Sequence, residues 1–346
     1  MEWVKSRLRK RKFYPKLLHL KKVPFYAKDR LLSRERRDRR FCVMPWTESA
    51  VVSDGTVLCS CIDAFKMMPL GNVERSAFKD IWRGKRYRRL RKAVRAGAEH
   101  VYLCSSCCFQ CDPPSAEQLE TEFPSEPRAL PTRLHIEPTV RCNLDCPACG
   151  NDLARLSRRF PDMKFETFCR VLDELGPHLT YLNFYDFGES FIHRQANDMI
   201  RYAKSVNPNL VIICSTNGHF FRTPEQQRAV IETGVDEIIF SVDGGSQKVY
   251  EKYRVGGRFD IVVDAMAGLV RMKREMGREK PSIMWRYILF DWNDSDEEMA
   301  RARELAREIG VDQFRWLLTD RPPDGASKRF VPGSPDLERI RDELFC

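Results

Sequence analysis

The sequence predicts an α/β fold: a partial (β/α)6 barrel preceded by a small cysteine-rich α+β domain. Two observations predict it. From Thr132 onward, apolar and β-branched runs of strand length alternate with stretches of helical periodicity. In residues 41–111, cysteines gather at short spacings instead. Strand–helix alternation over this length implies right-handed crossovers and a parallel sheet, and six such units fit an incomplete barrel.

Six stretches of the barrel have strand character, and helical stretches separate consecutive pairs. The spacing of Val263, Met266 and Val270 illustrates the helical pattern. In parallel barrels, the loops after the carboxyl ends of the strands converge on one mouth, so we expect the functional groups there. The expected strands are Arg133–Glu137, Tyr181–Asp186, Leu210–Ser215, Glu237–Asp243, Ile283–Phe290 and Gln313–Leu318.

Composition divides the chain into five segments. A Pro- and acid-rich stretch separates the cysteine-rich domain from the barrel and is typical of a linker. The C-terminal tail is rich in Pro and Gly before a short helix-like end, and the sequence assigns it no role. The segments are a basic arm (1–40), the cysteine-rich domain (41–111), the linker (112–131), the barrel (132–320) and the tail (321–346).

The net charge of +10 is concentrated in the basic arm. Residues 1–40 hold 16 Lys and Arg against 4 Asp and Glu, a balance of +12, so the rest of the chain sums to −2. A basic arm on a near-neutral body suggests an anionic partner, such as a phosphate-bearing substrate, a membrane surface, nucleic acid or an acidic protein. A solvated arm that packs lightly on the body is an equal alternative.

Cysteine usage indicates the compartment. The chain has 13 cysteines, an odd number clustered in short-spaced groups. This pattern favours metal binding in a reducing cytosol over a secreted disulfide framework. No apolar run approaches the length of a membrane span. We therefore expect a soluble, cytoplasmic protein without a transmembrane segment.

Three cysteines follow the first expected strand of the barrel. Cys142, Cys146 and Cys149 are separated by three and then two residues. Three thiolates are one fewer than the common clusters use, and a site one ligand short keeps an open position for a substrate. A closed zinc site needs a fourth Cys or His, but His135 lies in an expected strand and His178 just before another. A cluster with an open iron is therefore favoured over zinc.

This spacing on a strand-to-helix loop resembles the radical S-adenosylmethionine (radical SAM) superfamily. The resemblance implies a [4Fe-4S] cluster whose open iron binds the amino and carboxylate groups of S-adenosyl-L-methionine. An electron from the reduced cluster then cleaves the cofactor, and the resulting 5′-deoxyadenosyl radical abstracts hydrogen from the substrate. The protein orients and shields this chemistry. The electron would come from an external donor such as flavodoxin or ferredoxin.

Polar groups at four further strand ends resemble the cofactor-binding segments of the same superfamily. A Gly-Glu pair follows the second strand, where Ser190 replaces the usual Pro, and a Thr-Asn-Gly segment follows the third. A Ser-x-Asp-Gly segment ends the fourth strand, and an Arg and an Asn accompany the fifth. The resemblance assigns cofactor contacts to Gly188, Glu189, Ser215, Asn217, Ser241, Asp243, Arg286 and Asn293.

The second cysteine group resembles the SPASM domain or its shorter Twitch form, which holds auxiliary four-iron clusters. The resemblance assigns Cys42, Cys59, Cys104 and Cys107 as ligands, and four cysteines close one such cluster. Here the module precedes the barrel, whereas it normally follows it, and its last cysteines are unusually compressed. Zinc is the rival metal for this group. The leftover Cys61, Cys108 and Cys111 could replace a ligand, hold a second cluster or donate a hydrogen atom, so Cys61 and Cys108 are the weak catalytic candidates.

These observations predict a radical SAM oxidoreductase or epimerase. An auxiliary cluster that accepts an electron from the substrate radical implies a dehydrogenation or a cross-link, whereas a thiol that quenches the radical implies an epimerisation. We expect a small or carrier-linked polar substrate because the sequence shows no separate peptide-recognition domain. The basic arm would suit an anionic substrate. A peptide-modifying maturase is the alternative. A zinc-stabilised nucleic-acid-binding protein and an iron–sulfur electron carrier are the rivals outside this chemistry.

Overall fold

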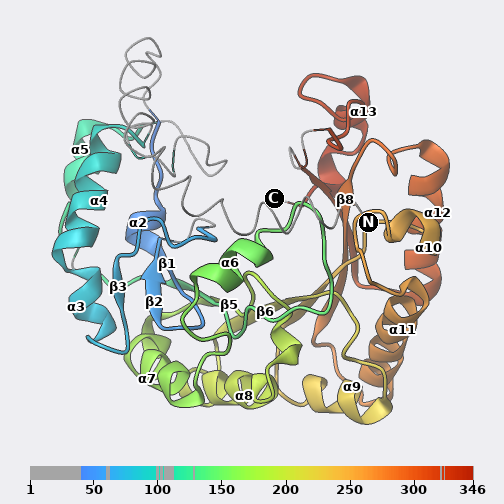
Figure 1. Ribbon diagram of the computed structural model, residues 1–346, viewed down its shortest axis with the longest axis horizontal. Helices are drawn as coiled ribbons and strands as arrows, with labels where there is room; N and C mark the ends of the chain where they lie inside the picture. Colours follow the sequence, from blue (N-terminus) through green and yellow to red (C-terminus); the bar gives the residue numbers. More distant parts are fainter. Residues whose placement is uncertain are drawn as a thin grey trace. The chain divides into compact units, whose positions relative to one another are not determined.

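A computed structural model describes most of the chain from Arg40 onward (Figure 1). The basic arm up to residue 39 lies outside the described residues, as do the cysteines at 61, 107, 108 and 111. The described residues are 40–59, 63–98, 101, 104, 113–127, 129–319, 322 and 324–345.

The described residues form two compact units. The first takes the residues up to Trp46 and those within Lys85–Pro127, and the second takes Thr47–Gly84 and the chain from residue 129 onward. No helix of the described residues is both long and apolar enough to span a bilayer.

The first unit is built around helices and an aromatic cluster. The indole of Trp46 stacks on Phe41 with ring centroids 5.4 Å apart, and Phe123 meets both rings edge-on. The Trp46 Nε1–H donates to the Pro124 carbonyl at 2.6 Å, which leaves the indole nitrogen satisfied. Its helices are α2 (Met44–Thr47, whose last residue belongs to the second unit), α4 (Lys85–Ala96) and α5 (Ala116–Thr121).

A nine-stranded sheet forms the centre of the second unit, in the order β3-β2-β1-β4-β5-β6-β7-β8-β9. The six strands that the sequence predicts are all present, and each is parallel to the next. The structure thus confirms an α/β fold with a mostly parallel sheet. These strands are β4 (Arg133–Ile136), β5 (Tyr181–Asn183), β6 (Val211–Thr216), β7 (Glu237–Ser241), β8 (Ser282–Leu289) and β9 (Gln313–Leu318).

Three short strands that precede the barrel in sequence extend its sheet. They are β1 (Glu48–Val51), β2 (Thr56–Leu58) and β3 (Gly71–Asn72). Strand β1 runs parallel to β4, whereas β2 and β3 continue antiparallel. The turn between β1 and β2 requires Gly55, whose φ of +79° favours a residue without a Cβ. The sequence analysis did not predict these strands.

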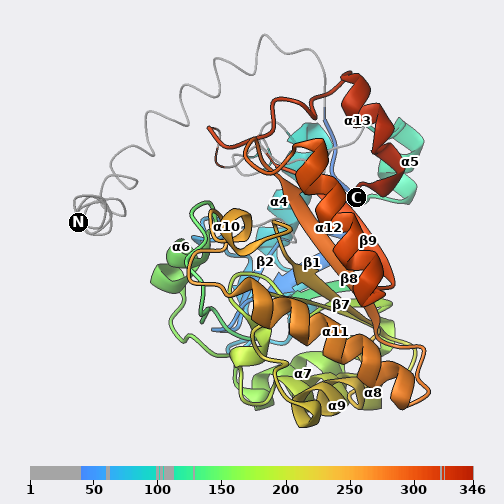
Figure 2. The same cartoon turned by 90° about the vertical axis from the view of Figure 1, so that its right-hand side faces the viewer.

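Helices cover one face of the sheet (Figures 1 and 2). That face is apolar, with fully buried Leu182, Ile212, Ile238 and Trp285 on consecutive strands. Apolar stripes at helical spacing pack against it because burial removes them from water. The helices of this unit are α3 (Phe78–Trp82), α6 (Asn151–Ser157), α7 (Phe165–Leu175), η2 (Gly176–His178), η3 (Ser190–Ile192), α8 (Ala196–Val206), α9 (Pro224–Ile231), α10 (Gln247–Tyr250), α11 (Phe259–Glu275), α12 (Asp296–Ile309), α13 (Pro335–Arg339) and η4 (Arg341–Glu343).

The opposite face of the sheet, which we call the inner face, carries polar side chains among apolar ones such as Ile213, Ile239 and Met284. Strand register places His135 beside Asn183, Glu237 beside Ser282 and Ser241 beside Arg286. Registered partners in neighbouring parallel strands point to the same side. Along β6 the half-buried Val211, Ile213 and Ser215 alternate with buried residues, so the inner face is less completely covered than the outer one. A ligand on the inner face would therefore meet hydrogen-bonding groups.

The tail packs on the last strand. The Phe345 N–H donates to the Trp316 carbonyl at 2.7 Å, and the Trp316 Nε1–H donates to Glu343 Oε2 at 2.7 Å. The ring of Phe345 lies 5.4 Å from the Arg286 guanidinium carbon. This segment, to which the sequence assigned no role, thus covers part of the β9 edge and contacts the inner face.

Candidate cofactor and cluster site

The three cysteines of the predicted cluster lie together on the loop between β4 and α6. Within the loop, the Leu144 N–H lies 3.4 Å from Cys142 Sγ, and the Cys149 N–H donates to the Cys146 carbonyl at 3.1 Å. The Asp145 N–H donates to the Val255 carbonyl at 3.0 Å, which ties the loop to the segment after β7. One loop therefore presents three thiols at the carboxyl end of the first barrel strand, as predicted.

The surrounding protein partly desolvates all three thiols, although Cys149 keeps an exposed surface. This desolvation raises the pKa of each thiol, and that of Cys146 to about 11, while the Arg254 guanidinium opposes the rise. Bound iron would supply the positive charge that holds these groups as thiolates. In the described residues, no three His, Cys, Asp or Glu side chains surround a single ion position. A cubane does not require this, because each thiolate binds a different iron. The donor set thus fits the predicted cluster.

Gly188 allows the segment after β5 to pack against the loop that carries Cys142, Cys146 and Cys149, which we call the cysteine loop. Its φ is +111°, and a Cβ at this position would lie 2.3 Å from the Thr139 carbonyl oxygen. The next N–H, of Glu189, donates to the Arg141 carbonyl at 2.8 Å. Only glycine permits this approach, so the Gly-Glu segment is held beside the residue that precedes Cys142.

The Glu189 carboxylate connects the segment after β5 to the carboxyl end of β6. It accepts hydrogen bonds from Thr216 Oγ1 at 2.9 Å and from the Asn217 N–H at 2.7 Å. The Asn217 amide in turn donates to Asn143 Oδ1 at 2.8 Å and approaches Cys142 Sγ at 3.8 Å. Burial raises the pKa of Glu189 to about 7 despite these hydrogen bonds. A cationic ligand would favour its ionised form, which fits the ammonium of S-adenosylmethionine.

Arg286, on β8, connects the carboxyl ends of β6, β7 and β8 on the inner face. Its Nη2 donates to Ser241 Oγ at 2.6 Å and to Ser215 Oγ at 3.2 Å. Its Nε is buried and has no hydrogen-bond partner among the described residues. Burial, together with the nearby Arg254, lowers the pKa of this guanidinium. An unsatisfied buried N–H and an uncompensated charge suit a carboxylate ligand, so these residues fit the carboxylate of the cofactor.

Asp243 and Asn293 also lie at this end of the sheet, but their side chains are occupied within the protein. Asp243 Oδ1 accepts from the Ile288 N–H at 2.7 Å. The Asn293 amide donates to the Asp243 and Ile288 carbonyls, and its Oδ1 accepts from the Phe290 N–H at 2.7 Å. Asn293 thus shapes the loop after β8. Contacts of both residues with the cofactor stay predictions.

Arg254 is a residue that the sequence reasoning missed. Its Nε donates to Asp243 Oδ2 at 2.6 Å, and its Nη1 lies 3.9 Å from Cys146 Sγ. Burial disfavours the charged guanidinium, but Asp243 and the Cys146 sulfur raise the pKa of Arg254 well above its usual range. Arg254 therefore connects the segment after β7 to the cysteine loop. It belongs to no motif, and no sequence signal singled it out.

Asp186 is a second residue that the sequence reasoning missed as a functional candidate. It follows β5, and burial, reinforced by the Glu137 carboxylate, raises its pKa to about 8. Glu137 itself forms a buried ion pair with Arg158, with Nε–Oε1 and Nη2–Oε2 distances of 2.8 and 2.9 Å. A carboxyl whose ionisation is disfavoured by burial thus lies close enough to Cys149 to act on its thiol.

The predicted auxiliary ligands are only partly described. Cys42 and Cys104 belong to the first unit and Cys59 to the second, and all three are buried. Cys107, Cys61 and Cys108 lie outside the described residues. The ligand set of the auxiliary cluster and the catalytic candidates therefore stay predictions.

Two sequence families match the chain in separate segments. Residues 42–111 match the iron–sulfur cluster-binding domain SPASM, and residues 136–302 match the radical SAM superfamily. The chain therefore carries a radical SAM domain and a SPASM domain. Its radical SAM domain implies a [4Fe-4S] cluster with S-adenosylmethionine, and its SPASM domain implies auxiliary iron–sulfur clusters. Both expectations from the sequence are thereby confirmed at the level of the domains.

Two curated relatives resemble this radical SAM chain. The tungsten-containing aldehyde ferredoxin oxidoreductase cofactor-modifying protein of Pyrococcus furiosus is 30% identical over 221 residues, which cover 61% of this chain and 58% of the relative. The PqqA peptide cyclase of Granulibacter bethesdensis is 24% identical over 199 residues, which cover 55% and 50%. The chain thus spans little more than half the length of these relatives.

Two solved structures resemble the chain more distantly. The methyltransferase TsrM from Kitasatospora setae has 14% identity and a TM-score of 0.45, covering 56% of this chain and 38% of that one. Methylornithine synthase has 15% identity and a TM-score of 0.41, covering 53% and 52%.

Replacing Gly188 by alanine in this radical SAM domain is expected to weaken binding of S-adenosylmethionine at least about tenfold, because a Cβ cannot fit against the Thr139 carbonyl and the strand end must move. Isothermal titration of the anaerobic protein with the cofactor measures the effect. Gly277 is the matched control, since its φ is +60° and a Cβ there meets nothing within 4 Å. Equal affinities for the Gly188 and Gly277 variants would contradict the role of the close contact.

Proposed function

We propose that this chain forms a 5′-deoxyadenosyl radical from S-adenosylmethionine bound at a cluster on Cys142, Cys146 and Cys149. The radical takes a hydrogen atom from a small or carrier-linked polar substrate on the inner face of the sheet. The observation that carries the proposal is the convergence of the cysteine loop, Glu189 and Arg286 at one end of the sheet, where the Arg286 Nε has no hydrogen-bond partner among the described residues.

The polar side chains on the inner face support a polar substrate. His135 Nε2 lies 3.0 Å from Asn183 Nδ2 and 3.4 Å from Glu48 Oε2, and the ring of Tyr185 meets the His135 ring edge-on. Hydrogen-bonding groups of this kind favour substrates with matching donors and acceptors, since buried polar groups cost free energy when left unpaired. The relative from Pyrococcus furiosus is named for modifying a cofactor, which agrees with a small-molecule substrate.

The net reaction follows from the fate of the substrate radical. If an auxiliary cluster accepts its electron, the product is a dehydrogenated or cross-linked compound. If a thiol such as that of Cys61 or Cys108 donates a hydrogen atom, the product is an epimer. A flavodoxin or ferredoxin would supply the electron that reduces the radical SAM cluster.

Peptide modification is the second candidate function. It is favoured by the likeness to the PqqA peptide cyclase, which is 24% identical over 199 residues. The small-molecule proposal takes precedence because the match covers only 50% of that relative and the relative named for modifying a cofactor is more similar, at 30% identity.

Anaerobic purification with assays of iron, sulfide and product tests the proposal. We expect about eight irons per chain, corresponding to two four-iron clusters, and 5′-deoxyadenosine after reduction by dithionite. Candidate sugars, aminocyclitols, nucleotides and peptides are then compared in deuterated water. A product that has the composition of the substrate but carries one deuterium indicates epimerisation. A product that has lost the mass of two hydrogens indicates dehydrogenation. Turnover of a peptide alone would reverse the choice of substrate class, and colourless protein without iron would refute the proposal.

A further inference from the structure

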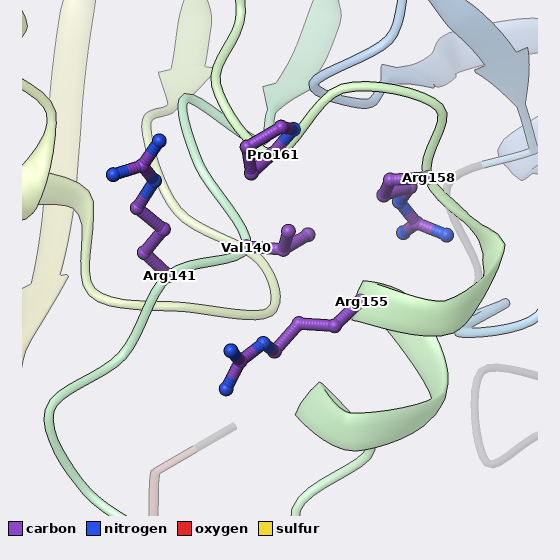
Figure 3. Close-up of a pocket in the computed structure, with 5 residues that line it drawn as sticks. All are labelled: Val140, Arg141, Arg155, Arg158 and Pro161. Carbon is purple, nitrogen blue, oxygen red and sulfur yellow. The ribbon is translucent and has the colours of Figure 1, made fainter.

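A pocket of about 360 Å³ lies beside the cysteine loop and is lined by three arginines (Figure 3). Arg141 directly precedes Cys142, and Arg155 extends from α6, which begins two residues after Cys149. Arg158 follows the same helix, and Val140 and Pro161 complete the lining. The pocket is therefore built from the two segments that enter and leave the proposed cluster site, and neither the cofactor contacts nor the inner face account for it.

The charges around the pocket are only partly compensated. Arg158 is paired with Glu137, and Arg141 is paired with Asp162 at 2.9 Å. The exposed Arg155 has no hydrogen-bond or ion-pair partner among the described residues. The guanidinium of Arg159 and the Nζ of Lys164 lie 5.1 and 5.8 Å from the centre of the Phe160 ring, and neither side chain is ion-paired within the described part of the chain. In the described part of the chain, Arg155, Arg159 and Lys164 thus form no ion pair with a carboxylate.

Apolar side chains are exposed in the same segment of the chain, between Arg155 and Lys164. Leu156 on α6 is 59% exposed and Phe160 is 42% exposed. Arginine and aromatic side chains are enriched in protein interfaces, where they contribute most of the binding energy. Cys149, one of the three proposed cluster ligands, is itself exposed. A partner bound here would lie close to the cluster, and electron-transfer rates fall steeply with distance.

We propose that this surface, which comprises Arg141, Arg155, Leu156, Arg159, Phe160 and Lys164, docks an acidic electron-donor protein. The inference rests on the proposed function. The donor loses one electron to the cluster and is itself oxidised by one electron, and no bond to the donor forms. The unpaired cations attract carboxylates on the donor and accelerate its encounter, and this attraction weakens with salt. Phe160 and Leu156 supply apolar contact area.

The double variant Arg155→Glu/Arg159→Glu tests the docking surface. Formation of 5′-deoxyadenosine is measured with two reductants: dithionite, which needs no docking site, and a reduced acidic plant-type ferredoxin. We expect the rate with dithionite to stay within about twofold of the wild type and the KM for ferredoxin to rise by about tenfold or more. Raising the salt concentration should increase the wild-type KM more than that of the variant. Arg228→Glu/Arg271→Glu, on α9 and α11, is the charge-matched control and should resemble the wild type.

Each other outcome overturns the proposal. An unchanged KM for ferredoxin, or an equal rise in the control variant, excludes docking at this surface. An equal loss of 5′-deoxyadenosine formation with dithionite would show that the two arginines support the cluster or the fold and not docking. The wild type could instead bind inorganic phosphate saturably, and the variant could lose this binding while its KM for ferredoxin stays unchanged. That result would indicate that the pocket binds a small anion. Absence of 5′-deoxyadenosine from wild-type protein with dithionite instead refutes the proposed function itself, so the two failures are distinguishable.

Discussion

Replacing Cys142, Cys146 or Cys149 by alanine is expected to abolish formation of 5′-deoxyadenosine. A cluster held by three thiolates loses a ligand, and alanine offers no donor in its place. The cysteines of the auxiliary domain are separate in sequence, so each variant should retain about four of about eight irons. Anaerobic iron and sulfide analysis, combined with quantitation of the product by mass spectrometry, measures both effects.

The matched control for these variants is Cys169→Ala. Cys169 lies on α7 and has no assigned ligand role, so its variant should keep the iron content and the cleavage activity of the wild type. Persistent cofactor cleavage in any of the three loop variants would count against the assignment of the cluster. Loss of all iron from them would indicate instead that the two clusters do not assemble independently.

Replacing Arg254 by methionine is expected to lower the free energy of unfolding by about 3–5 kcal/mol, since it leaves the buried Asp243 carboxylate without its cation. The variant should also lose iron from the radical SAM site more readily, because Arg254 Nη1 lies 3.9 Å from Cys146 Sγ. Denaturant unfolding of the anaerobic protein, followed by circular dichroism and by the absorbance of the cluster, checks both expectations.

A double variant separates the ion pair from other effects of Arg254. Asp243→Asn/Arg254→Met removes both charges and is expected to cost less stability than Arg254→Met alone, because no uncompensated charge stays buried. Full additivity of Asp243→Asn and Arg254→Met would contradict a direct interaction between the two side chains. Recovery of stability without recovery of iron would indicate that Arg254 also holds the cysteine loop through Cys146.

The sequence predicted the six barrel strands because their apolar and β-branched runs are bounded by clear turn signals. It did not predict β1, β2 and β3, whose two to four residues are too short for a periodic pattern to be distinguished from a loop. Their partners are contributed by tertiary contacts, since β1 pairs with β4, more than eighty residues later. Local sequence carries little information about such pairing.

The candidate site was predictable where residue type and spacing carry the chemistry. The three cysteines and Gly188 belong to recognisable motifs, and the structure brings their loops together. Arg254 was not predictable, because its importance comes from a buried contact with Asp243 and not from its neighbours in sequence. The internal hydrogen bonds that occupy the Asn293 amide likewise depend on how the loop after β8 folds back.

The parallel pairing of β1 with β4 affects how this protein can be dissected. Residues 41–111 could be removed to isolate the radical SAM domain from its auxiliary module. This deletion would remove β1, so the backbone N–H and C=O groups on that side of β4 would lose their hydrogen-bond partners. A bare strand edge is a template for pairing between molecules. A truncation placed at the family boundary would therefore yield aggregated protein, whereas one that begins before Thr47 would preserve the sheet.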